Sequence, residues 1–175
     1  VVGIVFMVAG FAFKVSAVPF HTWAPDTYQG APLPVTAFLS VASKAAGFVA
    51  LVALIFVAFP GEDSIYGPFV WALAALTMTV GNVLALRQTN IVRMLAYSSV
   101  SQGGFILMPL AFANTNDAGG TVLKAVVVYL LVYALTNLGA FATVIAVTRK
   151  TRSGEISSFG GLLQYAPGLA VMLTV

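Results

Sequence analysis

Two lysines stand inside apolar stretches of this sequence, where an amine can carry charge through a membrane. Lys44 lies in the middle of the run from Pro34 to Phe59, which holds no other charged residue, and Lys14 lies within the run from Val1 to Val18. An ammonium group near the bilayer centre costs roughly 2.5–3.5 kcal/mol on insertion scales, so such lysines usually face a protein interior or water. The pair predicts a path for protons, because burial and a neighbouring cation both favour the neutral amine.

A structural role for the two lysines gives the same pattern. Lysines that only neutralise a buried carboxylate would also sit in apolar runs, although we favour the relay. No acidic residue lies inside any apolar run of the chain. A buried lysine is best tolerated beside a carboxylate, so we expect its counter-charge to lie outside this sequence.

The composition predicts an integral membrane protein. Hydrophobic residues make up 60% of the chain and charged residues 7%, with a mean hydropathy of +1.00, whereas soluble domains carry about 25% charged residues. Because every backbone polar group must be satisfied inside a bilayer, we expect an all-α polytopic transmembrane helix bundle. With no cysteine and one histidine, we expect no disulfide, no metal site and no redox centre in this chain.

The apolar runs predict about five spans plus the start of a sixth. Val1 opens inside an apolar run without a preceding Met, and the last run, Pro167 to Val175, has nine residues, whereas a span needs about 20. We therefore expect residues 1–175 to be an internal, central fragment of a longer polytopic protein. The five predicted spans cover approximately 2–17, 35–59, 69–86, 91–113 and 122–148.

The first span is expected to be broken near Pro19. A proline has no N–H, so Pro19 should free the carbonyl of Val15, next to Lys14, and interrupt the helix near Val18–Phe20. Broken helices at membrane depth survive where they are buried in protein or line a wet cavity, although a simple proline kink is the plainer alternative. His21, just past the break, should face the protein interior, as a proton carrier or as a satisfied structural group.

Polar residues mark one face of three predicted spans. Thr36, Ser40 and Lys44 recur at four-residue steps and share a helix face. In the fourth span, residues 98–104 form a polar and small cluster around Gln102, which either cements helices or holds water in the path of Lys14 and Lys44. The fifth span aligns Tyr129, Tyr133 and Asn137, a stripe that is more typical of packing.

Basic residues between the spans predict the topology. They gather at 87–93 and 149–155, while Glu62, Asp63 and Asp117 lie in the other loops. By the positive-inside rule, both basic connections and the segment Pro25–Pro34 should be cytoplasmic, in the plasma membrane of a bacterium. The basic balance of +3 therefore indicates topology and not nucleic-acid binding.

Two runs of the sequence resemble a known family. The run FKVSAVPFHTWAPD at residues 13–26, continued by YQGAPLPVTAFLSVASKAAG at 28–47, is similar to the core of the antiporter-like membrane subunits of respiratory complex I. The run GNVLALRQTNIVRMLAYSS at 81–99 supports the same family, and the resemblance covers nearly the whole chain. It implies the central stretch of a fourteen-helix protein, from about its seventh helix to the approach to its twelfth.

The resemblance also implies a function and a set of partners. Lys14 matches the lysine of the broken seventh helix and Lys44 the central lysine of the eighth, both thought to carry protons. Such a chain would translocate protons in NADH:quinone oxidoreductase, with the lipid bilayer and the other membrane subunits of the complex as its partners. NADH, flavin, iron–sulfur clusters and quinone would be bound by partner subunits. A subunit of a multisubunit cation/proton antiporter and a structural spacer subunit are the alternatives. Where relatives commonly carry histidine in SSIAHAGY, this chain has Gln102 in SSVSQGGF, which cannot titrate.

Overall fold

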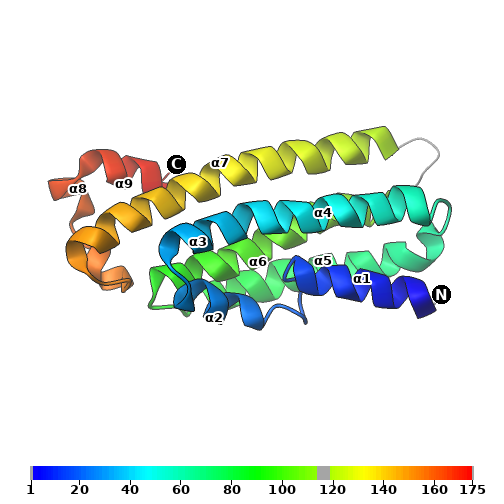
Figure 1. Cartoon of the computed structure of the whole chain (residues 1–175), viewed down its shortest axis with the longest axis horizontal. Helices are drawn as coiled ribbons and strands as arrows, with labels where there is room; N and C mark the ends of the chain where they lie inside the picture. Colours follow the sequence, from blue (N-terminus) through cyan, green and yellow to red (C-terminus); the bar gives the residue numbers. More distant parts are fainter. Residues whose placement is uncertain (1, 114–118, 175) are drawn as a thin grey trace.

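Long helices running side by side make up the molecule (Figure 1). The structure is a computed structural model that describes residues 2–113 and 119–174, and in these ranges it contains helices and one isolated β-bridge but no sheet. Asp117, used above to predict the topology, lies outside the described residues. The expected all-α bundle is confirmed.

The predicted spans correspond to helices with somewhat shifted ends. The first two helices are α1, Val2–Lys14, and α2, Trp23–Gly30. One continuous helix follows, made of α3 (Leu33–Phe38), the π-helix η1 (Leu39–Ser43), α4 (Lys44–Ala53) and the π-helix η2 (Leu54–Ala58). Three long helices come next: α5 (Asp63–Ala85), α6 (Ile91–Leu110) and α7 (Gly119–Thr151). After them come the 3-10 helix η3 (Ile156–Phe159), α8 (Leu162–Tyr165) and α9 (Pro167–Thr174), which folds back along α7.

Three helices in the described ranges are long and apolar enough to cross a membrane by length and composition. They are the continuous helix 33–58, α5 and α7. The other two predicted spans are the apolar but shorter α1 and the more polar α6. Five membrane crossings therefore remain a prediction.

The broken helix near Pro19 is confirmed, but α1 ends earlier than predicted and for another reason. Ser16 has a φ of 62°, in the left-handed region. The N–H of Ser16 donates to Phe13 O at 3.1 Å and the N–H of Ala17 to Ala12 O at 2.8 Å, the paired bonds of a Schellman helix end. The helix has thus closed at Lys14, before Pro19 can disrupt it, and the chain stays non-helical until Trp23.

Contacts with neighbouring helices hold the break in place. The N–H of Val18 donates to Thr77 Oγ1 on α5 at 2.9 Å, and the indole N–H of Trp23 donates back to Phe13 O at 3.2 Å. Thr77 therefore satisfies a buried backbone donor of the break. In Figure 1, α1 and α2 lie one after the other along the same side of the bundle.

Glycine allows α5 and α6 to pack as the closest helix pair. A Cβ added to Gly104 would lie 2.7 Å from Met78 Cγ and 2.8 Å from Met78 N, and one added to Gly81 would lie 2.8 Å from Ser101 N. These approaches are shorter than side chains tolerate, so only glycine fits at either position. Gly104, a small residue of the cluster in the fourth predicted span, thus serves the packing of α6 against α5.

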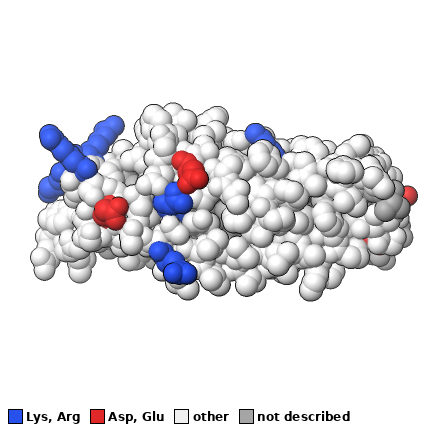
Figure 2. All heavy atoms as spheres, turned by 90° about the horizontal axis from the view of Figure 1, so that it is seen from below, with Lys and Arg blue, Asp and Glu red and all other residues white. Residues whose placement is uncertain are grey.

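Charged residues gather toward the two ends of the bundle. Figure 2 shows lysine and arginine side chains mainly over one half of the face in view, with acidic side chains among them, further acidic atoms at the opposite tip and few charges between. The long middle is therefore the part with the composition of a membrane-embedded surface.

Candidate functional site

Lys44 is the buried charge at the centre of the candidate site. It is the first residue of α4, directly after the π-helix η1, and its side chain is 3% exposed. The ammonium nitrogen donates to Ser99 O on α6 at 2.6 Å and to Ser99 Oγ at 2.8 Å. Neutral oxygens of α6 thus take the place of a counter-ion among the described residues, where the one ion pair is Arg93 with Asp26.

The predicted stripe on the helix of Lys44 is confirmed. Thr36 and Ser40 are both 0% exposed and lie on the buried side with Lys44. Thr36 Oγ1 donates to Tyr28 O on α2 at 2.9 Å, and Ser40 Oγ donates to Ala37 O at 2.8 Å. Through Thr36 this face of the helix is hydrogen-bonded to α2, and through Lys44 it contacts α6.

Tyrosine hydroxyls extend the hydrogen bonds of Lys44 to α7. Ser99 Oγ lies 2.7 Å from the hydroxyl oxygen of Tyr133, which donates to Ser40 O at 3.1 Å. Because the Tyr133 hydrogen is directed to Ser40, its oxygen is free to accept from the Ser99 hydroxyl. Asn137 Nδ2 donates to Ser40 Oγ at 2.7 Å, and the Tyr28 hydroxyl is 3.5 Å from Ser99 Oγ.

This network was missed from the sequence. The spacing of Tyr129, Tyr133 and Asn137 indicated a shared stripe on one helix, which we interpreted as packing. Tyr133 and Asn137 instead bond to the helix of Lys44. The available signal was the presence of three hydrogen-bonding groups on one face of a long apolar helix, where polar groups need partners.

Lys14 does not join the buried group in this chain. Its side chain is exposed, although we expected Lys14 and Lys44 to lie on one path. Its stem passes over α4, since a Cβ added to Gly47 would lie 3.1 Å from Lys14 Cγ. The break and Lys44 both lie close to Gly103 on α6, where an added Cβ would be 3.5 Å from Val15 O and 3.8 Å from Lys44 Nζ.

His21 faces the interior, as expected. It is 9% exposed, and its ring centre lies 6.3 Å from that of Tyr97 on α6. Among the described residues, two buried side-chain polar atoms have no hydrogen-bond partner, His21 Nδ1 and Ser16 Oγ. Both belong to the segment between α1 and α2, so the break concentrates unsatisfied polar groups that suit water.

Gln102 lies on another face of α6 from the one that meets Lys44. Its Oε1 accepts the hydroxyl of Tyr129, and both residues line a groove of about 430 Å³ between α6 and α7 with Ser98, Tyr133 and Asn137. Ser101 faces α5, where its hydroxyl donates to Met78 O at 3.5 Å. Ser98 and Gln102 therefore face the groove while Ser101 meets α5, so the polar cluster of this helix is divided between two neighbouring helices. Tyr133 still connects the groove with Ser99.

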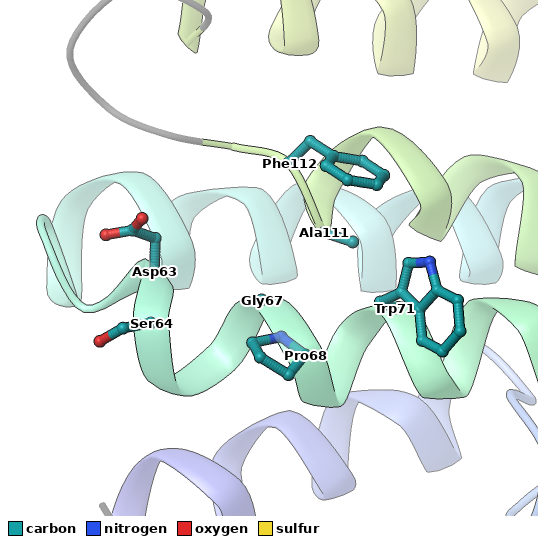
Figure 3. Close-up of a pocket in the computed structure, with 7 residues that line it drawn as sticks. All are labelled: Asp63, Ser64, Gly67, Pro68, Trp71, Ala111 and Phe112. Carbon is teal, nitrogen blue, oxygen red and sulfur yellow. The ribbon is translucent and has the colours of Figure 1, made fainter.

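A second hollow lies at the acidic end of the bundle (Figure 3). It has a volume of about 440 Å³ and is lined by α5 and the end of α6, including Asp63, Trp71 and Phe112. It contains none of the predicted site residues. Among the described residues there is also no group of histidine, cysteine or acidic side chains that could hold a metal ion.

Comparison with known proteins gives one consistent family. A family model described as "NADH:quinone oxidoreductase/Mrp antiporter, TM" matches residues 1–175. NADH-quinone oxidoreductase subunit N of Desulforamulus reducens is 47% identical over 175 residues, which are 100% of this chain and 36% of that protein. NAD(P)H-quinone oxidoreductase subunit 2 of Synechocystis is 47% identical over 99% of this chain and 32% of that protein. The chain spans about a third of the length of these curated relatives.

Two solved complexes contain chains with a similar fold. A chain of respiratory complex I from Thermus thermophilus matches 96% of this chain and 35% of its own length, with a TM-score of 0.69 and 32% identity. A chain of the Mrp complex from Dietzia matches 99% of this chain and 31% of its own, with a TM-score of 0.87 and 25% identity. Because this family model matches every residue, and because relatives named subunit N or subunit 2 are 47% identical over nearly the whole chain, the chain belongs to the NADH:quinone oxidoreductase/Mrp antiporter family of membrane subunits.

Proposed function

We propose that residues 1–175 are the central part of a proton-translocating membrane subunit of NADH:quinone oxidoreductase, with Lys44 as a proton carrier. The observation that carries this proposal is the burial of Lys44 in an apolar bundle with neutral oxygens as its partners. A lysine without a carboxylate beside it is held less firmly in its charged form than one in an ion pair. It can therefore release and regain a proton as its surroundings change.

The hydrogen bonds of Lys44 suggest where its proton goes. A proton that passes from Lys44 Nζ to Ser99 Oγ displaces the Ser99 hydroxyl proton toward Tyr133. The Tyr133 hydroxyl, which also lines the polar groove between α6 and α7, then turns its own hydrogen from Ser40 O toward that groove and releases it there. The neutral Lys44 amine is then reloaded from the other side, where the carbonyl of Val15 and the broken segment lie close to Gly103.

The remaining candidate residues take supporting roles in this proposal. Lys14 stands over the helix of Lys44 and, as a second cation, would favour proton release from it. The relatives are about three times as long as this chain, so we expect further helices of the subunit to cover Lys14 and to supply the missing carboxylate. His21 and Gln102 would hold water at the break and in the groove.

The energy for proton movement would come from partner subunits. NADH, flavin, iron–sulfur clusters and quinone would be handled by those chains, and this subunit would couple quinone reduction to proton movement across the bacterial plasma membrane. In this topology, the segments 25–34, 87–93 and 149–155 face the cytoplasm, and protons and the lipid bilayer are the remaining partners.

A second candidate is a subunit of a multisubunit cation/proton antiporter. The TM-score of 0.87 to a chain of the Mrp complex favours it, whereas the 47% identity to subunit N favours the oxidoreductase. Inverted membrane vesicles that contain the full-length subunit distinguish the two. We expect proton uptake that starts with NADH and does not depend on sodium. Uptake that follows a sodium gradient without NADH would assign the antiporter instead.

A further inference from the structure

A hollow outside the Lys44 site opens at the basic end of the bundle. It has a volume of about 410 Å³ and lies where α2 leads into α3, α6 begins and α7 ends. Its lining includes Gln29, Leu33, Asn90, Val92, Thr148 and Arg152. None of these residues takes part in the hydrogen bonds of Lys44.

Backbone pairing builds the frame of this hollow. The N–H of Ile91 donates to Gly154 O at 2.9 Å, and the N–H of Ile156 donates to Thr89 O at 2.8 Å. The loop before α6 is thereby tied to the chain that follows α7. A Cβ added to Gly154 would lie 3.0 Å from Asn90 Nδ2, so the two segments are in close contact. These hydrogen bonds and this contact hold the walls of the hollow in fixed positions.

The side-chain amides of the hollow retain donors, because their acceptors are already used. Asn90 Oδ1 accepts the N–H groups of Val92 and Arg93 at the start of α6. Gln29 Oε1 accepts from the guanidinium of Arg93 at 3.0 Å. What each amide can still offer a ligand is its NH₂ group, and Arg152 adds a permanent cation. A site that offers two amide NH₂ groups and a guanidinium to a ligand is suited to bind an anion.

The charge around the hollow has the same sign. The loops and helix ends near it carry Arg87, Arg93, Arg149, Lys150 and Arg152, against Asp26 and Glu155, and Arg93 is paired with Asp26 at 2.6 Å. Lysine and arginine side chains gather in this half of the molecule (Figure 2). Lys150 stands over the ring of Tyr165, which leaves Arg152 as the cation in the hollow itself.

The hollow also has an apolar side. Leu33 and Val92 line it, and farther along α3, on another side of the helix from Leu33, Val35 is 47% and Phe38 64% exposed. A basic pocket at a helix end, beside apolar helix surface, suits a ligand with an anionic head and hydrocarbon tails. We propose that this hollow binds the phosphate of an anionic phospholipid, whose acyl chains run along α3.

Lipid binding to the full-length subunit in its complex tests this site. The complex is depleted of lipid in detergent and titrated with phosphatidylglycerol, phosphatidylcholine or inorganic phosphate, and bound lipid and the thermal unfolding temperature are measured. We expect phosphatidylglycerol to bind saturably and to raise the unfolding temperature. Arg152→Gln should weaken its binding by about fivefold or more, the effect of one basic group at an anionic surface.

Matched variants separate a built site from general surface charge. Arg149→Gln removes an exposed cation of the same region that does not line the hollow, and should leave lipid binding within about twofold. Arg152→Lys should retain most of it. Arg152 has a φ of 55°, and neither Gln nor Lys adds new strain there, because both carry the same Cβ as arginine.

Three results would overturn the proposal. Equal losses in Arg152→Gln and Arg149→Gln would mean that only the overall charge of this end attracts lipid. Equal protection by phosphatidylcholine, or by inorganic phosphate at similar concentration, would remove the requirement for an anionic lipid. Absence of any bound lipid in the wild-type complex would mean that another part of the subunit fills the hollow.

Discussion

Lys44 and Ser99 are joined by two hydrogen bonds, one to the backbone carbonyl at 2.6 Å and one to the hydroxyl at 2.8 Å. The carbonyl is present whatever residue stands at position 99, whereas only the hydroxyl continues toward Tyr133. The first bond therefore places the lysine, and the second offers a route for its proton. Substitutions can separate these two contributions.

Replacing Ser99 with alanine should slow proton transfer without displacing Lys44. The variant keeps the carbonyl bond and loses the hydroxyl link, so we expect NADH-driven pumping to fall by about threefold or more, in keeping with the loss of one hydrogen bond. Proton uptake by inverted vesicles measures it. Ser101→Ala, on the same helix but with its hydroxyl facing Met78 O on α5, should pump nearly as well as wild type. Equal pumping by all three proteins would remove Ser99 from the path.

Replacing Tyr133 with phenylalanine should reduce both stability and pumping. The ring still fills its place, but Ser40 O and Ser99 Oγ lose a buried partner, at a cost of about 1–3 kcal/mol. Thermal unfolding of the purified complex measures the first effect, and vesicle proton uptake the second. A variant that is destabilised yet pumps normally would give Tyr133 a structural role alone.

Replacing Gly104 with alanine should disturb the packing of α5 against α6. The added Cβ meets Met78 N at 2.8 Å, and such overpacking costs about 1–3 kcal/mol. The matched control is Gly103→Ala on the same helix, whose Cβ would find nothing closer than 3.5 Å. We expect reduced assembly of the subunit for Gly104→Ala only. Normal assembly of both variants would show that α5 and α6 can move apart freely.

The sequence predicted the burial of Lys44 and the face that it shares with Thr36 and Ser40, because a four-residue repeat follows from helix geometry alone. It also predicted a break near Pro19. It could not predict that Ser16 would adopt a left-handed conformation and close α1 first, since that conformation is usually taken by glycine. Nor could the spacing of Tyr133 and Asn137 reveal their partners, because a stripe identifies a face and not the helix that meets it.

Gln102 offers a test of whether water in the α6–α7 groove matters. Gln102→Leu removes the acceptor of the Tyr129 hydroxyl and a water partner, so proton transfer should be impaired. Gln102→His should be tolerated, because it keeps hydrogen bonding and restores a residue common in relatives. Vesicle proton uptake compares the two. If Gln102→Leu pumps as well as wild type, the residue only packs α6 against α7.

Proton pumping by a Lys44→Met variant of the full-length subunit tests the central claim most directly. Methionine keeps the length and apolar volume of the side chain and removes the proton carrier. With assembly verified and NADH oxidation measured in parallel, we expect proton uptake to fall by about tenfold or more. Lys44→Arg should fail similarly, because arginine stays charged. Lys124→Met, at an exposed lysine of α7, should pump normally. Wild-type pumping by an assembled Lys44→Met complex would contradict the assignment of Lys44 as the proton carrier.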